Sequence, residues 1–211
     1  MKKIILLILC LIIILTLAGC KNYEISNETL NDPALDGAED PENALEDIII
    51  DLETLNIKTA YANYSNDAQI YRVCLNGDKM LESAVQHMPI YKFDVKEELE
   101  RFKNDFSGIL TMDLGYDETP SFNDAVSGYD DDFFAEHTLL LAYIQANSGS
   151  FRYGIKDIVC DDSSFCMYIH KTVDPEVYTC DMSGWFVMAE FEDRNIQNCE
   201  SFDAQLINET T

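Results

Sequence analysis

The last third of this 211-residue chain is a series of strand-like segments joined by short turns, and this pattern constrains the fold most strongly. Residues 139–144 form a continuous apolar run, which is typical of a buried strand. Residues 151–159 and 165–173 alternate in hydrophobicity, residues 185–192 add another strand, and residues 200–207 are expected to form a final edge strand. Such a series favours an antiparallel sheet or a β-sandwich.

The alternation also predicts which side chains share a face. In residues 151–159 it places Asp157 on the same side as Phe151 and Tyr153, and it places Ile158 on the opposite side. In residues 165–173 it separates two sets, and one set lies on each face: Phe165, Met167, Ile169 and Lys171, against Cys166, Tyr168, His170 and Thr172.

The middle of the chain combines strands and helices. Residues 48–50, 57–64 and 70–75 are expected to be strands. Asp94 is expected to begin a helix, with Glu97 as its capping-box partner. The apolar stripe on this helix consists of Val95, Leu99, Phe102 and Phe106.

Two shorter helices are expected to begin near residues 119 and 130, and Phe133 and Phe134 are expected to anchor the second of them in the core. The predicted fold class is therefore α+β. It has an antiparallel sheet or β-sandwich-like C-terminal half and a few short helices within a globular region at 45–211.

The N-terminal segment predicts export. Lys2 and Lys3 precede an apolar run that ends in Leu17-Ala18-Gly19-Cys20. This order has the parts of a secretory signal peptide, and it resembles a bacterial lipoprotein signal in which Cys20 is acylated, with palmitate for example. The alternative, an uncleaved membrane anchor, is disfavoured because the apolar run is shorter than the ~20 residues of a spanning helix.

These residues divide the N-terminal part into two segments. Residues 1–19 are the predicted signal peptide, and residues 20–44 are an acidic, flexible tether rich in turn-forming residues. The expected location is the extracellular face of the bacterial cell membrane.

The charge balance limits the class of partner. The chain has 14 Lys and Arg against 39 Asp and Glu, a net charge of −25. Nucleic-acid binding is not expected, because phosphates require a basic surface. Anionic lipid headgroups are repelled as well, so the predicted membrane contact is the lipid on Cys20.

Five cysteines remain after the predicted lipidation: Cys74, Cys160, Cys166, Cys180 and Cys199. An exported chain can keep disulfides, although an odd number leaves at least one thiol unpaired in a monomer. Cys160 and Cys166 flank a turn-like segment between two strands and form the first candidate pair. Cys180 and Cys199 form a second.

No catalytic constellation is visible, and neither an enzyme activity nor a cofactor or metal is expected. Cys166 and His170 lie about 13 Å apart at the rise of a strand, too far apart for a catalytic dyad. The acidic residues Asp124, Asp130–Asp132, Asp161 and Asp162 have the oxygen ligands that calcium prefers. Acids at a helix start are, however, also stabilised by the helix dipole without a metal.

The turn after the first buried strand is the best candidate for protein binding. Ser148, Gly149, Ser150 and Arg152 lie in a hairpin tip with neighbouring aromatic residues, and Asp181 and Trp185 follow in a later loop and strand. The alternative is a simple hairpin in which Gly149 supplies a positive φ and the aromatic residues pack inward.

Residues from about 133 to 207 carry a resemblance. The strand, the turn "ANSGSFRYGI", the hairpin "CDDSSFCMYI" and the later "VDP" are similar to the C-terminal domain of the PrcB-like protease-complex-subunit family. The family's usual turn is richer in glycine and threonine, and residues 45–132 are not covered. The resemblance implies a β-rich, non-catalytic accessory or inhibitor-like subunit of a surface protease. The alternative function is a cation- or solute-binding surface lipoprotein that uses its acidic clusters.

Overall fold

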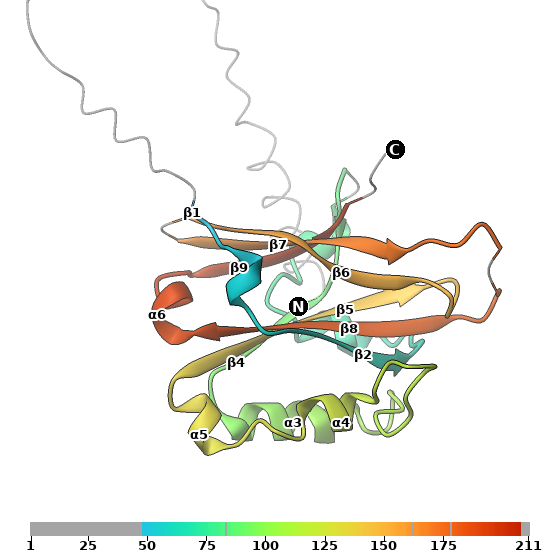
Figure 1. Cartoon of the computed structure of the whole chain (residues 1–211), viewed down its shortest axis with the longest axis horizontal. Coiled ribbons are helices and arrows are strands. Elements are labelled where there is room, and N and C mark those ends of the chain that lie inside the picture. The colour runs from blue at the N-terminus through green and yellow to red at the C-terminus, as the bar shows by residue number, and fades with distance from the viewer. Residues whose placement is uncertain (1–47, 83, 162, 178, 208–211) are drawn as a thin grey trace, which may run out of the picture. The chain divides into compact units, whose positions relative to one another are not determined.

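Two facing sheets form the centre of the protein, and helices cover one of them (Figure 1). The structure is a computed structural model, and it describes residues 48–207 except residues 83, 162 and 178. The predicted signal peptide and tether lie outside these residues. The two sheets and short helices confirm the predicted α+β class with a sandwich-like C-terminal half. No helix within the described ranges is long and apolar enough to cross a bilayer.

The first sheet has five strands in the order β1-β6-β7-β9-β3, and the second has four in the order β2-β8-β5-β4. The strands of the first sheet are β1 (Ile48–Ile49), β3 (Gln86–His87), β6 (Arg152–Cys160), β7 (Ser164–Val173) and β9 (Ser201–Leu206). The strands of the second are β2 (Ile57–Asn63), β4 (Ile90–Phe93), β5 (His137–Ala146) and β8 (Ser183–Glu192). The described helices are η1 (Leu52–Thr54), α2 (Ala68–Arg72), η2 (Lys79–Leu81), α3 (Lys96–Phe106), α4 (Phe122–Val126), α5 (Asp131–Phe134) and α6 (Asp193–Ile196).

Strands β5 and β8 are buried on both faces, which explains their continuous apolar sequences. Leu140 and Trp185 belong to the core between the two sheets. Leu139 and Phe186 belong to a second core, between the four-stranded sheet and the helices. The apolar side chains on either face of these two strands are therefore buried in one of the two cores.

Helix α3 confirms the predicted helix and most of its stripe. Leu99, Phe102 and Phe106 are buried, whereas Val95 is 45% exposed. The predicted Asp94–Glu97 capping box is wrong, because the carboxylate of Asp94 accepts a hydrogen bond from Thr138 Oγ1 at 2.6 Å. Glu98, not Glu97, accepts from the backbone N–H of Asp94 at 3.0 Å.

Helices α4 and α5 confirm the two short predicted helices. Ser121 caps α4 and Asp130 caps α5, each by accepting a hydrogen bond from a backbone N–H in the first turn. Phe134 is buried, and Phe133 packs against the same core while partly exposed.

The predicted strand at 70–75 is wrong, because this segment contains the end of helix α2 and a turn. Asp67 starts the helix, since its Oδ1 accepts a hydrogen bond from the backbone N–H of Gln69 at 2.8 Å. Only Ile70 of the helix is buried, and Val73 and Leu75 are exposed. The apolar residues at 70–75 therefore do not form a strand.

Two further expectations about the strands are also corrected. A register shift between Ile155 and Asp157 exchanges the sheet faces on which the following side chains lie. Ile158 therefore points into the core instead of away from it. Strand β9 is not an edge, because it lies between β7 and β3 and runs parallel to β7.

Candidate functional site

Three connections meet at one end of the sandwich, at the right of Figure 1. They are residues 147–151 between β5 and β6, residues 174–182 between β7 and β8, and residues 113–120 before α4. The first two contain most of the side chains that the sequence suggested for binding. The third contributes Tyr116 and Asp117, which the sequence did not suggest.

Asp181 joins the three connections through its carboxylate. It accepts hydrogen bonds from Tyr116 Oη at 3.0 Å, from the backbone N–H of Gly149 at 3.3 Å and from Thr179 Oγ1. The bond from Thr179 is the main cause that lowers the pKa of Asp181. The same carboxylate raises the pKa of Tyr116, so Asp181 is ionised and Tyr116 is a neutral donor at neutral pH.

Hydroxyl groups connect the hairpin tip to the β7–β8 connection. Thr179 Oγ1 lies 3.2 Å from both Ser148 Oγ and Ser150 Oγ. Ser148 Oγ also accepts from the backbone N–H of Ser150 at 3.0 Å. These bonds give the tip a defined conformation.

Arg152 is fixed in place by the tip and by two aromatic rings. Its Nη1 donates to the carbonyl oxygens of Gly149 at 2.6 Å and of Phe151 at 2.9 Å, and its Nη2 lies 3.3 Å from Asp117 Oδ2. The guanidinium carbon lies 4.7 Å from the centroid of the Trp185 ring and 5.5 Å from that of Tyr116. The side chain is therefore held rather than freely mobile.

The six sequence-suggested residues thus come together but have different exposures. Trp185, Ser148 and Gly149 are buried, so they support the surface from beneath. Ser150 and Arg152 are partly exposed, and Asp181 is exposed. Gly149 does not have a positive φ; instead, a Cβ there would meet the side chains of Tyr116 and Asp181, which pack closely over the backbone at this position.

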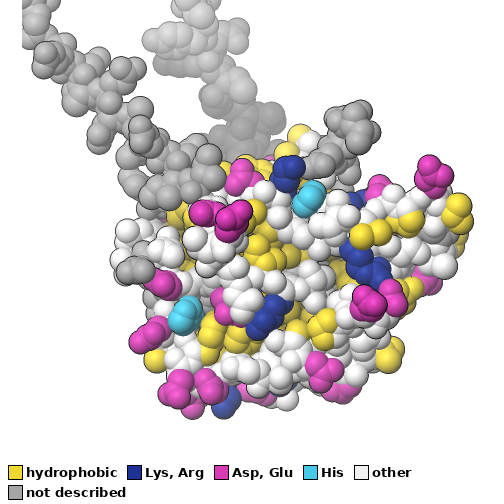
Figure 2. Space-filling view, in the orientation of Figure 1, with side chains coloured by type: hydrophobic (Ala, Val, Ile, Leu, Met, Phe, Trp, Pro, Cys, Tyr) yellow, Lys and Arg dark blue, Asp and Glu magenta, His cyan; other side chains and the backbone are white. Residues whose placement is uncertain are grey.

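An open pocket of about 660 Å³ lies over this network. We call its lining the tip surface: Tyr116, Asp117, Gly149, Ser150, Arg152, Val173, Pro175 and Val177. Val177 is 88% exposed and Val173 is 46% exposed. At the right of Figure 2, hydrophobic side chains lie exposed beside basic and acidic ones at this end of the molecule. No sequence pattern singled out Val177, because the β7–β8 connection mixes apolar and polar residues.

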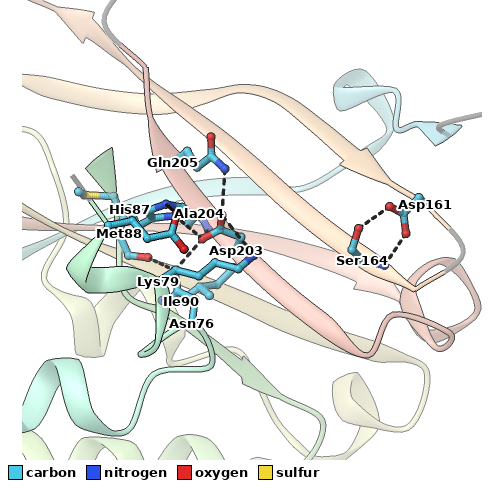
Figure 3. Close-up of polar contacts among 11 residues, drawn as sticks. Asn76, Lys79, His87, Met88, Ile90, Asp161, Ser164, Asp203, Ala204 and Gln205 are labelled. Carbon is cyan, nitrogen blue, oxygen red and sulfur yellow. Dashed lines mark hydrogen bonds and ion pairs between the residues drawn. The ribbon is translucent and has the colours of Figure 1, made fainter. Parts of the chain in front are cut away.

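Three described acidic residues of the predicted cation clusters have structural partners, whereas Asp131 and Asp132 lie exposed in the first turn of α5. Asp130 caps α5, and Asp124 Oδ2 accepts from Ser121 Oγ at 2.7 Å. Asp161 closes the β6–β7 turn by accepting from the backbone N–H groups of Ser163 and Ser164. Figure 3 shows its contacts with Ser164. Asp162 lies outside the described residues. Within the part of the chain that the structure describes, no group of three or more His, Cys, Asp or Glu side chains is arranged to hold a metal.

A second polar cluster surrounds the buried carboxylate of Asp203 on β9 (Figure 3). Its Oδ1 lies 2.9 Å from both Asn76 Nδ2 and His87 Nδ1, and its Oδ2 accepts from Gln205 Nε2 at 2.9 Å. Lys79 Nζ lies 3.7 Å from Oδ2. The sequence did not indicate this cluster, because its members come from three separate segments, at residues 76–79, 87 and 203–205, without a recognisable spacing.

Cys166 lies in register with Asp203 on the neighbouring strand, but it is a poor nucleophile. Burial raises the pKa of its thiol to about 11, so it is protonated at neutral pH.

The predicted Cys160–Cys166 disulfide does not agree with the strand register. Cys160 pairs with Phe165 across the β6–β7 hairpin, and both side chains belong to the core between the sheets. Cys166 is the next residue on β7, so its side chain points to the opposite face. In the second candidate pair, Cys180 is exposed and Cys199 is buried.

No protein-family model matches the chain, and neither the curated proteins nor the solved structures include a match.

Proposed function

We propose that this chain is a non-catalytic protein-binding module, held at the extracellular face of the bacterial membrane by a lipid on Cys20. The observation that carries this proposal is the tip surface. It combines exposed valines, an aromatic side chain and a fixed arginine on a rigid hydrogen-bonded base. Aromatic residues and arginine are enriched at binding hot spots, and a rigid surface loses little entropy on association.

The charges around the tip surface indicate the chemistry of the partner. Arg152 is already paired with Asp117, and Asp174 is paired with Lys171, whereas Glu118 and Glu176 are exposed beside the lining residues. An apolar centre with an acidic rim suits a protein segment that presents basic residues around an apolar one. The resemblance to PrcB-like subunits makes a surface protease or its accessory chain the first partner to test.

A photo-reactive phenylalanine analogue at position 177 tests this proposal on intact cells. We expect it to cross-link one defined extracellular protein, whereas the same analogue at the exposed Leu81, which does not line the tip surface, should not. With the captured protein purified, Val177→Asp should weaken its affinity about tenfold or more, which corresponds to about 1.4 kcal/mol. Equal capture at both positions, or an unchanged affinity, would refute the proposal.

The lipid anchor has a separate test. Cells fed an alkyne-labelled fatty acid should label the wild-type protein and the Cys10→Ser variant, because Cys10 leaves with the signal peptide. Cys20→Ser should abolish the label. Label that persists in Cys20→Ser would show that the membrane contact has another origin.

A further inference from the structure

Two buried thiols from distant parts of the chain lie in contact. Cys160 is the last residue of β6, and Cys199 lies between α6 and β9. Their sulfur atoms are 2.8 Å apart. Cys160 is 6% exposed and Cys199 is 9% exposed, and both belong to the core between the sheets.

Each thiol is positioned by its own backbone contacts. Cys160 is in the antiparallel ladder opposite Phe165. The backbone N–H of Cys199 donates to Ile196 O at 3.1 Å, and that of Glu200 donates to Ser163 O at 2.7 Å. The segment around Cys199 is therefore tied to the β6–β7 turn, and the two sulfurs meet without either element having to move.

We propose that Cys160 and Cys199 form a disulfide in the exported protein. The bond between the two sulfurs forms as each thiol loses its proton, and the two electrons pass to the disulfide of a thiol oxidoreductase, which becomes a dithiol. An S–S bond of ~2.05 Å requires only that the side chains draw slightly closer. The proposal depends on the export expected from the N-terminal signal and not on the tip surface.

The other cysteines have no comparable partner among the described residues. Cys166 points to the outer face of β7, and Cys180 is exposed in the β7–β8 connection. Cys74 belongs to the second core, where its sulfur lies 3.1 Å from Tyr71 O. The pair at 160 and 199 thus uses two of the five cysteines and leaves three as thiols.

The bond is expected to form during folding rather than afterwards. Burial raises the pKa of Cys199 to about 12, so the folded protein contains almost no thiolate at this position. Attack on the oxidant is faster while the chain is open and the thiol is exposed. Once formed, the disulfide is protected from external reductants by the same burial.

Thiol mapping of the full-length lipoprotein tests the proposal. Cells are quenched with acid, and the protein is denatured, alkylated with N-ethylmaleimide and digested without reduction. The expected result is one linked peptide pair containing Cys160 and Cys199, with the label on Cys74, Cys166 and Cys180. Label on both Cys160 and Cys199, or a link from either to another cysteine, overturns the proposal.

Melting temperature gives a second reading. Cys199→Ala is expected to melt roughly 5–10 °C below the wild type, and wild-type protein refolded in reductant should lose the same margin. Cys180→Ala, at the exposed position, should keep the wild-type melting temperature. A wild type unaffected by reductive refolding would contradict a stabilising bond. Val177→Asp should keep the linked peptide, so a failure of the binding proposal is distinguishable from a failure of this one.

Discussion

The guanidinium of Arg152 lies over the ring of Trp185, with 4.7 Å between the guanidinium carbon and the ring centroid. Arg152 is the first residue of β6 and Trp185 is near the start of β8, so this contact joins the two sheets at the end that presents the tip surface. The buried ring thereby fixes the position of a partly exposed cation. The contact connects the core to the proposed binding surface.

Replacing Arg152 with Met should lower the free energy of unfolding by about 1–3 kcal/mol, because the carbonyls of Gly149 and Phe151 lose their donor. Arg152→Lys should recover only part of the loss, since a lysine cannot reproduce the planar fork. Urea denaturation measures both. Arg101→Met, at an exposed position on α3, is the control and should change stability by less than about 0.5 kcal/mol. Equal stabilities for the two Met variants would show that these contacts contribute nothing.

Gly149→Ala should destabilise the hairpin tip. The new Cβ would lie too close to both Tyr116 Oη and Asp181 Oδ2, so both side chains have to move and their mutual hydrogen bond is disturbed. The expected loss is about 1–3 kcal/mol, together with weaker partner binding. Gly108→Ala is the matched control, because its Cβ would meet nothing within 4 Å. A tip that tolerates alanine at 149 as well as at 108 would mean that the close approach is not required.

Asp203 should contribute stability that is lost in acid. Burial alone would raise its pKa, but hydrogen bonds from Gln205, Asn76 and His87, together with the charge of Lys79, outweigh burial and hold the pKa below its usual value. A carboxyl group with a lowered folded pKa stabilises the protein above its unfolded pKa of about 3.9, and the contribution disappears as the pH falls through the folded value.

Asp203→Asn should therefore be less stable than the wild type by about 1–3 kcal/mol at pH 7, and the difference should shrink below about pH 4. Melting temperatures between pH 7 and pH 2 measure this difference. Asp105→Asn, at an exposed position on α3, provides the comparison for loss of one surface carboxylate. If the difference in melting temperature between the wild type and Asp203→Asn stays constant down to pH 2, Asp203 is not ionised in the way assigned here.

The residues of the predicted apolar stripe on α3 should contribute unequally to the free energy of unfolding. Leu99→Ala should cost about 2–5 kcal/mol, because it leaves a cavity in the core between the helices and the four-stranded sheet. Val95→Ala should stay within about 0.5 kcal/mol, since Val95 is 45% exposed. Chemical denaturation of the two variants makes the comparison. Similar losses at both positions would mean that Val95 is buried in solution.

Local hydrophobic patterns correctly predicted the strands and helices whose buried face can be read from the spacing of apolar residues along the chain. The apolar run at 139–144 became β5, and the stripe of Leu99, Phe102 and Phe106 faces the core as expected. Where a contact from a distant segment intervened, the prediction failed. Thr138 engages Asp94 and displaces the expected cap, and the register shift after Ile155 reverses the face of Ile158.

The residues of the candidate site can be divided in the same way, into those that a local pattern indicated and those that only distant contacts bring together. The turn at 147–150 and its neighbour Arg152 stood out in the sequence because glycine, serine and arginine beside aromatic residues suit recognition. Tyr116, Asp117 and Val177 did not, because they reach the tip surface only when separate connections meet. The Asp203 cluster was likewise hidden, since Asn76 and Asp203 lie 127 residues apart.

By itself the sequence determined the α+β class and the strand-rich C-terminal half, because hydrophobic periodicity is a local property of neighbouring residues. The acidic character followed directly from the composition. The tertiary structure alone decided which cysteines meet, which serines are buried and which connection completes the tip surface. Those outcomes depend on strand order and register, including the parallel pairing of β9 with β7. Order and register bring together residues far apart in the chain, and no local pattern encodes such contacts.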